Sequence, residues 1–301
     1  MIEETFQDMP DIPKLDVADV ATALPDLQNI AVVDRGGQKL VFRATYNGQP
    51  YAVKFALLPS DVDNEDLEHT EITQRASREV EIMRDCTSPF MVKLGPIGLN
   101  FTTVADQQLL YFSEEFIEGS SVKALLRDGP LSLDRVVRLG TQISNAIKEL
   151  WALGKIHRDI KPANIMQRTN GAFVLLDAGL AFDVVGDSLS KGFIVGTMPY
   201  FSPEQFDYDN RRRVLDFRSD IFSLGVTLYE AITGQHPFWT RGDNSASVFR
   251  KITAITPPPP SAIRPEVPKE LDRLILRMMA KSPHLRYRKC DDLISALNGF
   301  G

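Results

Sequence analysis

The chain has 301 residues, of which 43% are hydrophobic and 25% charged, and this is the composition of an ordinary folded globular protein. Its length provides enough apolar material to bury the core of one large domain or of two lobes. The formal net charge of -6 argues against a nucleic-acid-binding protein, which would carry a basic face, and no apolar run approaches the ~18 residues that cross a membrane.

The N-terminal part of the chain is expected to be rich in β-strands. Residues 1–27 contain three prolines and several acidic residues, which predict an irregular extension. Asn47-Gly48 lies between two β-prone runs, and both residues tolerate a positive φ, so KLVFRATYNGQPYAVKF predicts a hairpin. The segment RASREVEIMRDC (75–86) has apolar residues at helical spacing and predicts a helix.

From about residue 119 the pattern becomes helical. One apolar stripe, which ends before Gly154, predicts a helix; its members are Leu139, Ile143, Ala146, Ile147 and Leu150. Asn170-Gly171 predicts a second hairpin, residues 219–234 a buried helix, and residues 268–281 an amphipathic helix that begins with proline. We therefore predict an α+β protein with an extension (1–27), a small β-rich lobe (28–117) and a larger helical lobe (118–301).

The segment KIHRDIKPANIMQRTNGAFVLLDAGLAF (155–182) concentrates groups that suit phosphate chemistry. Asp159 could act as a base, and Lys161 would neutralise a negative group during its transfer. Asn164 and Asp177 carry hard oxygen ligands of the kind that Mg²⁺ prefers. Since they border the two strands of one predicted hairpin, we expect them to meet at one metal ion.

HRDIKPAN followed by DAG resembles the catalytic loop and the metal-binding turn of eukaryotic-type protein kinases. The C-terminal part, from SPEQ to HLRYR, most resembles bacterial members of this family. Other family motifs follow in the same order over about residues 28–299, which implies a two-lobed kinase fold. YAVK resembles the strand whose lysine binds the ATP phosphates, which gives that role to Lys54. The helix REVEIM would supply its partner, and the spacing selects Glu79 over Glu81.

The resemblance also implies a nucleotide site and a set of structural residues. YFSEEFIEG resembles the hinge, with Glu114 as gatekeeper. The residues placed around ATP are Gly36, Gly37, Val41, Ala52, Lys54, Glu115, Phe116, Ile117 and Met166. The structural residues are His157, which organises the loop, Arg158, Asp220, which braces the loop, and Glu204, which pairs with Arg286.

The segment between Asp177 and Glu204 resembles the activation segment and substrate loop of this family. Thr197 matches the substrate-loop threonine, which with Lys161 is typical of serine/threonine kinases. Ser188 and Ser190 are the candidates for autophosphorylation, because a phosphate there would bind Arg158 and order the segment.

Two positions depart from the family pattern. The glycine loop reads DRGGQKLV, so Asp34, Gly36 and Lys39 occupy its three glycine positions; Lys39 could reach phosphate or lie in solvent. Ala178 replaces a phenylalanine whose ring normally packs between His157 and Met83. We expect the Met83 side chain to fill that space, because it is unbranched and adapts to irregular gaps.

We therefore expect a serine/threonine protein kinase that uses ATP and Mg²⁺ and acts on protein substrates and on itself. The degenerate glycine loop and Ala178 leave a nucleotide-binding pseudokinase scaffold as an alternative, and a small-molecule kinase is a second one. Cys86 and Cys290 lie far apart without metal-like spacing, and the acidic start MIEETFQD lacks a basic signal region. These features favour a cytoplasmic location, whereas the oligomeric state is left open.

Overall fold

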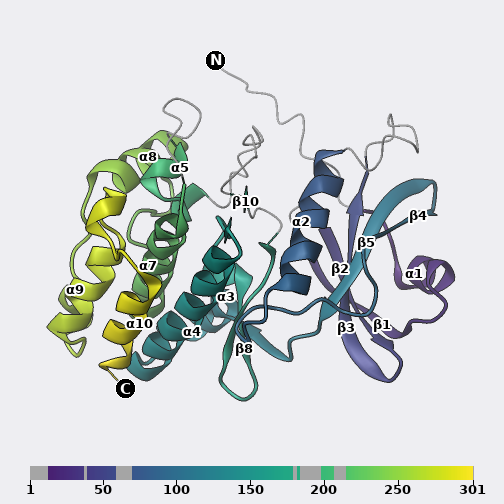
Figure 1. The fold of residues 1–301 in the computed structure, drawn as a ribbon, viewed down its shortest axis with the longest axis horizontal. Helices are drawn as coiled ribbons and strands as arrows, with labels where there is room; N and C mark the ends of the chain where they lie inside the picture. Colours follow the sequence, from purple (N-terminus) through teal and green to yellow (C-terminus); the bar gives the residue numbers. More distant parts are fainter. Residues whose placement is uncertain are drawn as a thin grey trace. The chain divides into compact units, whose positions relative to one another are not determined.

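The computed structural model describes residues 13–36, 39–58, 70–178, 182–183, 198–206 and 215–300. The chain divides into two compact units, one of residues up to 84 together with 93–116 and one of residues 85–92 together with 117–301 (Figure 1). The segment 85–92, expected in the first lobe, thus groups with the second unit. Among the helices of the described ranges, none combines the length and the hydropathy that a membrane span requires.

The first unit is built on a five-stranded antiparallel sheet with the strand order β1-β2-β3-β5-β4. The predicted hairpin is confirmed as β2–β3, and its turn residues Asn47 and Gly48 have φ of 49° and 77°. The predicted helix is confirmed as α2, which is longer than expected. The elements of this unit are α1 (Val17–Ala23), β1 (Gln28–Gly36), β2 (Lys39–Tyr46), β3 (Gln49–Leu57), α2 (Glu71–Asp85), β4 (Asn100–Val104) and β5 (Gln107–Glu115).

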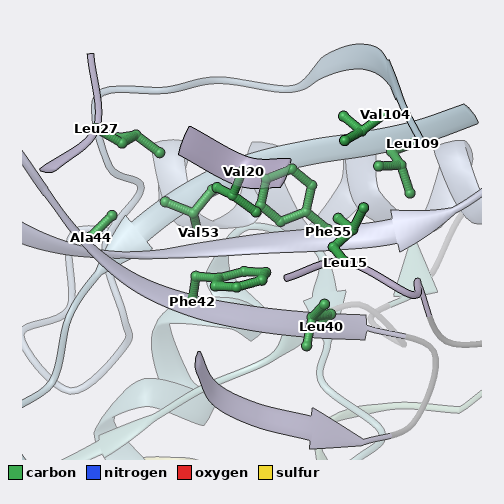
Figure 2. Close-up of a cluster of buried hydrophobic side chains, with 10 residues drawn as sticks. All are labelled: Leu15, Val20, Leu27, Leu40, Phe42, Ala44, Val53, Phe55, Val104 and Leu109. Atoms are coloured by element: carbon green, nitrogen blue, oxygen red, sulfur yellow. The ribbon is translucent and has the colours of Figure 1, made fainter. Parts of the chain in front are cut away.

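One face of this sheet carries an apolar core (Figure 2). Side chains alternate between the faces of a strand, so Leu40 and Phe42 of β2 point into this core, whereas Lys39 and Val41 point to the opposite face. Phe42 and Phe55 meet edge to face with ring centroids 5.7 Å apart. The sequence pattern of β2 therefore separates an apolar face from a face that bears charge.

Residues 13–27, which we expected to be irregular, contain helix α1 and cover this core. Asp16 caps the helix in a reciprocal arrangement with Asp19, and each side chain accepts a hydrogen bond of 2.9 Å from the other residue's backbone N–H. Leu15, Val20 and Leu27 are buried in the cluster. The prediction of an irregular segment was wrong here because Pro13 and Pro25 flank the helix and do not interrupt it.

The second unit is mainly helical. The predicted helices are confirmed: α4 packs against α7 and α10, and α7 packs against α9. The second hairpin is confirmed as β8–β9, with Gly171 at φ 86° in its turn. The α-helices are α3 (Val122–Leu125), α4 (Leu133–Ala152), α5 (Pro203–Phe206), α7 (Phe217–Thr233), α8 (Ser245–Ala254), α9 (Lys269–Met278) and α10 (Cys290–Asn298). The strands are β6 (Gly119–Ser121), β7 (Lys155–Ile156), β8 (Ile165–Arg168), β9 (Phe173–Leu175) and β10 (Phe182–Asp183). The 3-10 helices are η2 (Leu126–Asp128), η3 (Pro162–Asn164), η5 (Met198–Tyr200), η6 (Pro260–Ala262) and η7 (Pro283–Leu285).

Candidate active site

The charged face of the first unit holds a cluster of two lysines and two glutamates. Lys54 on β3 lies between two carboxylates, with its Nζ 2.8 Å from Oε1 of Glu79 on α2 and 2.8 Å from Oε2 of Glu114 on β5. Lys39 on β2 reaches the other oxygen of Glu79, at 2.5 Å. We refer to Lys39, Lys54, Glu79 and Glu114 as the lysine–glutamate cluster. Its formal charges sum to zero, which suits groups with so little exposure to water.

The sequence pointed to Lys54 and Glu79, but not to the contacts of Glu114 and Lys39. The strand register carried the missing information, because Lys54 pairs with Phe112 and Ala52 with Glu114, which places Lys54 and Glu114 on one face. On β2, Val41 pairs with Lys54 and Lys39 pairs with Ala56, so Lys39 belongs to that face as well.

Other residues expected around the nucleotide belong to both units. In the first unit, Val41 is half-buried and Ala52 buried on the face that carries Lys54, and Gly36 ends β1. Glu115 ends β5, and the Phe116 ring lies 5.0 Å from the guanidinium carbon of Arg43. In the second unit, Ile117 is buried, and Met166 on β8 pairs with Ser121 and Val174.

Asp159 in the second unit has two carboxylate oxygens in different surroundings. Oδ2 accepts hydrogen bonds from Lys161 Nζ at 2.9 Å and from Asn164 Nδ2 at 2.8 Å. Oδ1 is buried and has no hydrogen-bond partner among the described residues. Burial raises the pKa of Asp159 to about 6, although Lys161 and Asn164 favour the ionised form. The carboxylate is thus held in place through one oxygen, and the other oxygen can accept a further hydrogen bond.

The backbone that presents Asp159 is fixed by Asp220 in the first turn of α7. The Asp220 carboxylate accepts hydrogen bonds of 2.8 Å from the backbone N–H groups of His157 and Arg158. These bonds hold Arg158 at φ 68°, a conformation that a non-glycine residue rarely adopts. Complete burial raises the pKa of Asp220 to about 6, against the effect of the two N–H groups.

His157 is fully buried and organises the same loop. Its Nδ1 accepts a hydrogen bond of 3.3 Å from the backbone N–H of Asp159, so the neutral ring carries its proton on Nε2, which lies 3.0 Å from the Leu176 carbonyl oxygen. His157 therefore ties the Asp159 loop to the residue that precedes Asp177.

Asn164 and Asp177, which the sequence suggested as ligands of one metal ion, lie on segments that are hydrogen-bonded to each other. Asn164 uses its amide nitrogen to bind Asp159, at 3.0 Å from the backbone oxygen, so its amide oxygen points the other way. The backbone N–H of Leu176 donates to the Asn164 carbonyl at 2.8 Å, which joins the two segments, and Asp177 follows at φ 58°. The proximity of the Asp177 charge also contributes to the raised pKa of Asp159. An amide oxygen and a carboxylate are among the ligand types that fit Mg²⁺, which usually takes few protein ligands and completes its shell with phosphate oxygens and water.

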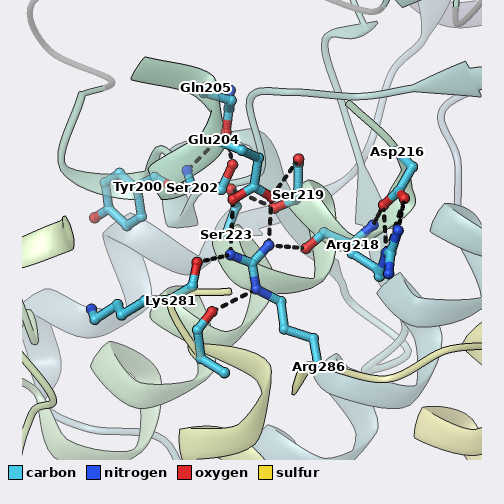
Figure 3. A network of polar contacts seen from close by, with 11 residues as sticks. Tyr200, Ser202, Glu204, Gln205, Asp216, Arg218, Ser219, Ser223, Lys281 and Arg286 are labelled. Carbon is cyan, nitrogen blue, oxygen red and sulfur yellow. Dashed lines mark hydrogen bonds and ion pairs between the residues drawn. The ribbon is translucent and has the colours of Figure 1, made fainter. Parts of the chain in front are cut away.

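Glu204 and Arg286 form a buried ion pair in the second unit (Figure 3). The guanidinium binds both carboxylate oxygens, at 2.5 and 2.9 Å, and donates further hydrogen bonds to the carbonyl oxygens of Ala280, Arg218 and Lys281. Next to Glu204, the side chain of Gln205 donates to the Arg158 carbonyl at 3.3 Å. The pair therefore connects α5 to the chain before α10, and Gln205 connects α5 to the loop that carries Asp159.

Some of the expected positions have no described geometry. Gly37, Ser188, Ser190 and Thr197 lie outside the described residues. Ala178 is fully buried in the second unit, and Met83 is buried in the first. The expected packing of Met83 against His157 joins the two units and stays a prediction.

The comparison with known families agrees with this geometry. A family model described as the protein kinase domain matches residues 28–295. The chain belongs to the protein kinase family. The expected two-lobed kinase fold, with a sheet-based first part and a helical second part, is thereby confirmed.

This kinase domain is similar to several bacterial proteins. It is 31% identical over 267 residues to the serine/threonine-protein kinase PknH of Mycobacterium tuberculosis (strain ATCC 25618 / H37Rv), covering 88% of this chain and 40% of PknH. It is 32% identical over 267 residues to PknE of the same strain, covering 88% of this chain and 44% of PknE. A probable serine/threonine-protein kinase of Clostridium perfringens (strain 13 / Type A) is 28% identical, with 88% and 37% covered. The chain thus spans less than half the length of these relatives.

Proposed function

We propose that this kinase domain transfers the γ-phosphoryl group of ATP to serine or threonine hydroxyls of proteins, with Mg²⁺ bound by Asn164 and Asp177. The observation that carries the proposal is the asymmetric environment of Asp159. Its Oδ2 is held by Lys161 and Asn164, while its buried Oδ1 has no hydrogen-bond partner among the described residues. An acceptor hydroxyl is the donor that this oxygen lacks, and phosphoryl transfer depends mainly on such positioning.

Each unit would contribute a distinct set of groups. In the first, Lys54 would bind the ATP phosphates, with Glu79 holding it in place, and Val41 and Ala52 would contact the adenine. In the second, Asp159 would orient the acceptor hydroxyl, and Lys161 would neutralise charge on the transferred group. Bound Mg²⁺ would neutralise charge on the phosphates. The names of the relatives support serine and threonine as acceptors.

The test is phosphoryl transfer from labelled ATP to generic protein substrates in the presence of Mg²⁺. Asp159→Asn keeps the shape and size of the side chain, but the amide cannot take a proton. It should lower the turnover number by about 10²–10⁴-fold and leave ATP affinity within about twofold, because Asp159 contacts the acceptor and not the nucleotide. A variant with the turnover of the wild-type protein would contradict the assigned role.

The same assay separates the two alternatives. A nucleotide-binding scaffold, which Ala178 and the altered glycine loop favour, would bind ATP without transferring phosphate to any acceptor. A small-molecule kinase would label low-molecular-weight alcohols and leave proteins unlabelled. Removal of Mg²⁺ with a chelator, followed by its return, shows whether transfer requires the metal.

We also propose autophosphorylation at Ser188 or Ser190. Arg158 adjoins the Asp159 loop, and a phosphate bound to a guanidinium forms charge-assisted hydrogen bonds that order a segment. Mass spectrometry of the chain after prolonged incubation with ATP should find phosphate on one of these serines. An unmodified segment after incubation would contradict this proposal alone and leave the transfer to other proteins untouched.

A further inference from the structure

The lysine–glutamate cluster contains a second lysine in a position similar to that of Lys54. Lys39 and Lys54 bind different oxygens of the Glu79 carboxylate, at 2.5 and 2.8 Å. Their Nζ atoms also lie at nearly the same distance from the centroid of the Phe112 ring, 5.8 and 5.7 Å. The two ammonium groups thus share one carboxylate and border one aromatic ring, although they come from different strands.

The two lysines differ in their access to water. The side chain of Lys54 is 7% exposed and lies between Glu79 and Glu114, whereas the side chain of Lys39 is 24% exposed. A lysine has a long flexible stem, so the more exposed ammonium can turn toward a second anion at a small cost in desolvation. Lys39 is therefore the member of the cluster that can most easily bind an incoming anion while Lys54 keeps its two carboxylates.

Position 39 explains why such a lysine would be useful. It is the third glycine position of the phosphate loop in the sequence motif that the chain resembles, and the first glycine position is Asp34. Glycines allow the backbone N–H groups to come close to phosphate, and a side chain at position 39 limits that approach. An ammonium group at the same position can replace the lost N–H contacts with a charge.

We propose that Lys39 is a second phosphate-binding lysine, which contacts the phosphates of ATP together with Lys54 while Glu79 positions both. This inference rests on the proposed function only in taking ATP as the nucleotide; it does not require that the bound phosphate be transferred. If instead Lys39 only supports Glu79, its loss should act through Lys54, so Lys39→Met should cause no further loss of ATP affinity in the Lys54→Met background.

Affinities for ATP and for adenosine, measured by calorimetry on the full chain, show whether Lys39 acts on the phosphates, and the Lys39→Gln variant and the Lys54→Met background separate the two roles. Lys39→Met should weaken ATP binding about tenfold and change adenosine binding less than twofold, because adenosine has no phosphate. Lys39→Gln, which can still donate a hydrogen bond to Glu79, should lose ATP affinity to a similar extent, whereas Lys39→Arg should keep most of it. Equal effects of Lys39→Met on ATP and adenosine, or no effect on either, would overturn the proposal.

Arg35→Met is the matched control. Arg35 lies on β1 and pairs with Leu40, so it is an exposed cation next to Lys39 in the sheet but on the opposite face. Its removal changes the net charge by the same amount and should leave the ratio of ATP to adenosine affinity unchanged. A loss as large as that of Lys39→Met would show a general charge effect and refute a contact by Lys39. Thermal melting of each variant confirms that it is folded.

A comparison with Lys54→Met tests whether the two lysines act on the same phosphates. Each single variant should retain a reduced preference for ATP over adenosine, and the Lys39→Met/Lys54→Met double variant should lose it.

The two proposals can fail separately. A wild-type chain that fails to transfer phosphate, but shows this pattern of affinities, would disprove the proposed transfer and leave the Lys39 inference standing. A chain that transfers phosphate, and in which Lys39→Met leaves the ratio of ATP affinity to adenosine affinity unchanged, would support the transfer and overturn the Lys39 inference. A wild-type chain that binds no ATP would overturn both.

Discussion

Removal of the Arg286 side chain should be among the most damaging single substitutions in the second unit. The guanidinium is buried and makes five hydrogen bonds, two with Glu204 and three with backbone carbonyls. Arg286→Met fills much of the same volume but leaves the Glu204 carboxylate buried, with a hydrogen bond of 2.8 Å from the Ser219 hydroxyl in place of a counter-charge. Since breaking a buried pair leaves an uncompensated charge, we expect the free energy of unfolding to fall by ~3–5 kcal/mol.

Urea unfolding followed by tryptophan fluorescence measures this loss directly, because Trp151 and Trp239 both belong to the second unit. The Glu204→Gln/Arg286→Met double variant removes the uncompensated charge, so its free energy of unfolding should be ~1–2 kcal/mol higher than that of Arg286→Met alone. Arg273→Met, which breaks an exposed pair with Glu270, serves as the control and should change stability little. A loss below ~1 kcal/mol for Arg286→Met, or no recovery in the double variant, would refute the reasoning that the buried charge dominates.

Three further predictions concern packing, backbone and pH. Val20→Ala should lower the free energy of unfolding of the first unit by ~1–3 kcal/mol, since Val20 of α1 is fully buried in the core cluster; hydrogen exchange of β1–β5 would show it, and unchanged protection would contradict it. Gly119→Ala should cost at least ~1 kcal/mol by urea unfolding, because φ is 151° and a Cβ would lie 1.9 Å from the Gln167 carbonyl oxygen, whereas Gly98→Ala, with open space around it, should cost little. Burial, followed by the charge of Arg286, lowers the pKa of Lys281 to about 7, although the Phe238 ring at 4.0 Å favours the ammonium form. The unfolded chain then binds more protons between about pH 7 and 10.5, so stability should rise across that range; Lys281→Met should flatten the rise and be the more stable protein below pH 7 in melting experiments.

The secondary structure that the sequence predicted best is the part determined by local chemistry. Asn47-Gly48 and Asn170-Gly171 form the expected turns because both positions of each pair tolerate the conformations that a tight hairpin needs. Helix α1 escaped prediction for the opposite reason. It has only seven residues, and its buried residue is Val20, so its stability depends on Leu15, Val20 and Leu27 packing on a sheet formed by later segments.

In the candidate site, the sequence could predict which residues take part but not which of them contact one another. Motif spacing could select Lys54, Glu79, Asp159, Asn164 and Asp177, because each stands at a fixed offset from its neighbours in the chain. It could not show that Glu114 contacts Lys54 or that Lys39 contacts Glu79, since these pairs join residues 60 and 40 positions apart in the chain, through the register of strands and a helix.

A partial signal for the position of Lys39 was nevertheless present in the segment KLVF. Alternation along a strand with Leu40 and Phe42 in the core requires Lys39 and Val41 to share the other face, and the register with β3 then places Lys39 beside the face of Lys54. A lysine in that position cannot be treated as an ordinary solvated surface residue, and this is the physical reason to test it against the phosphates of ATP.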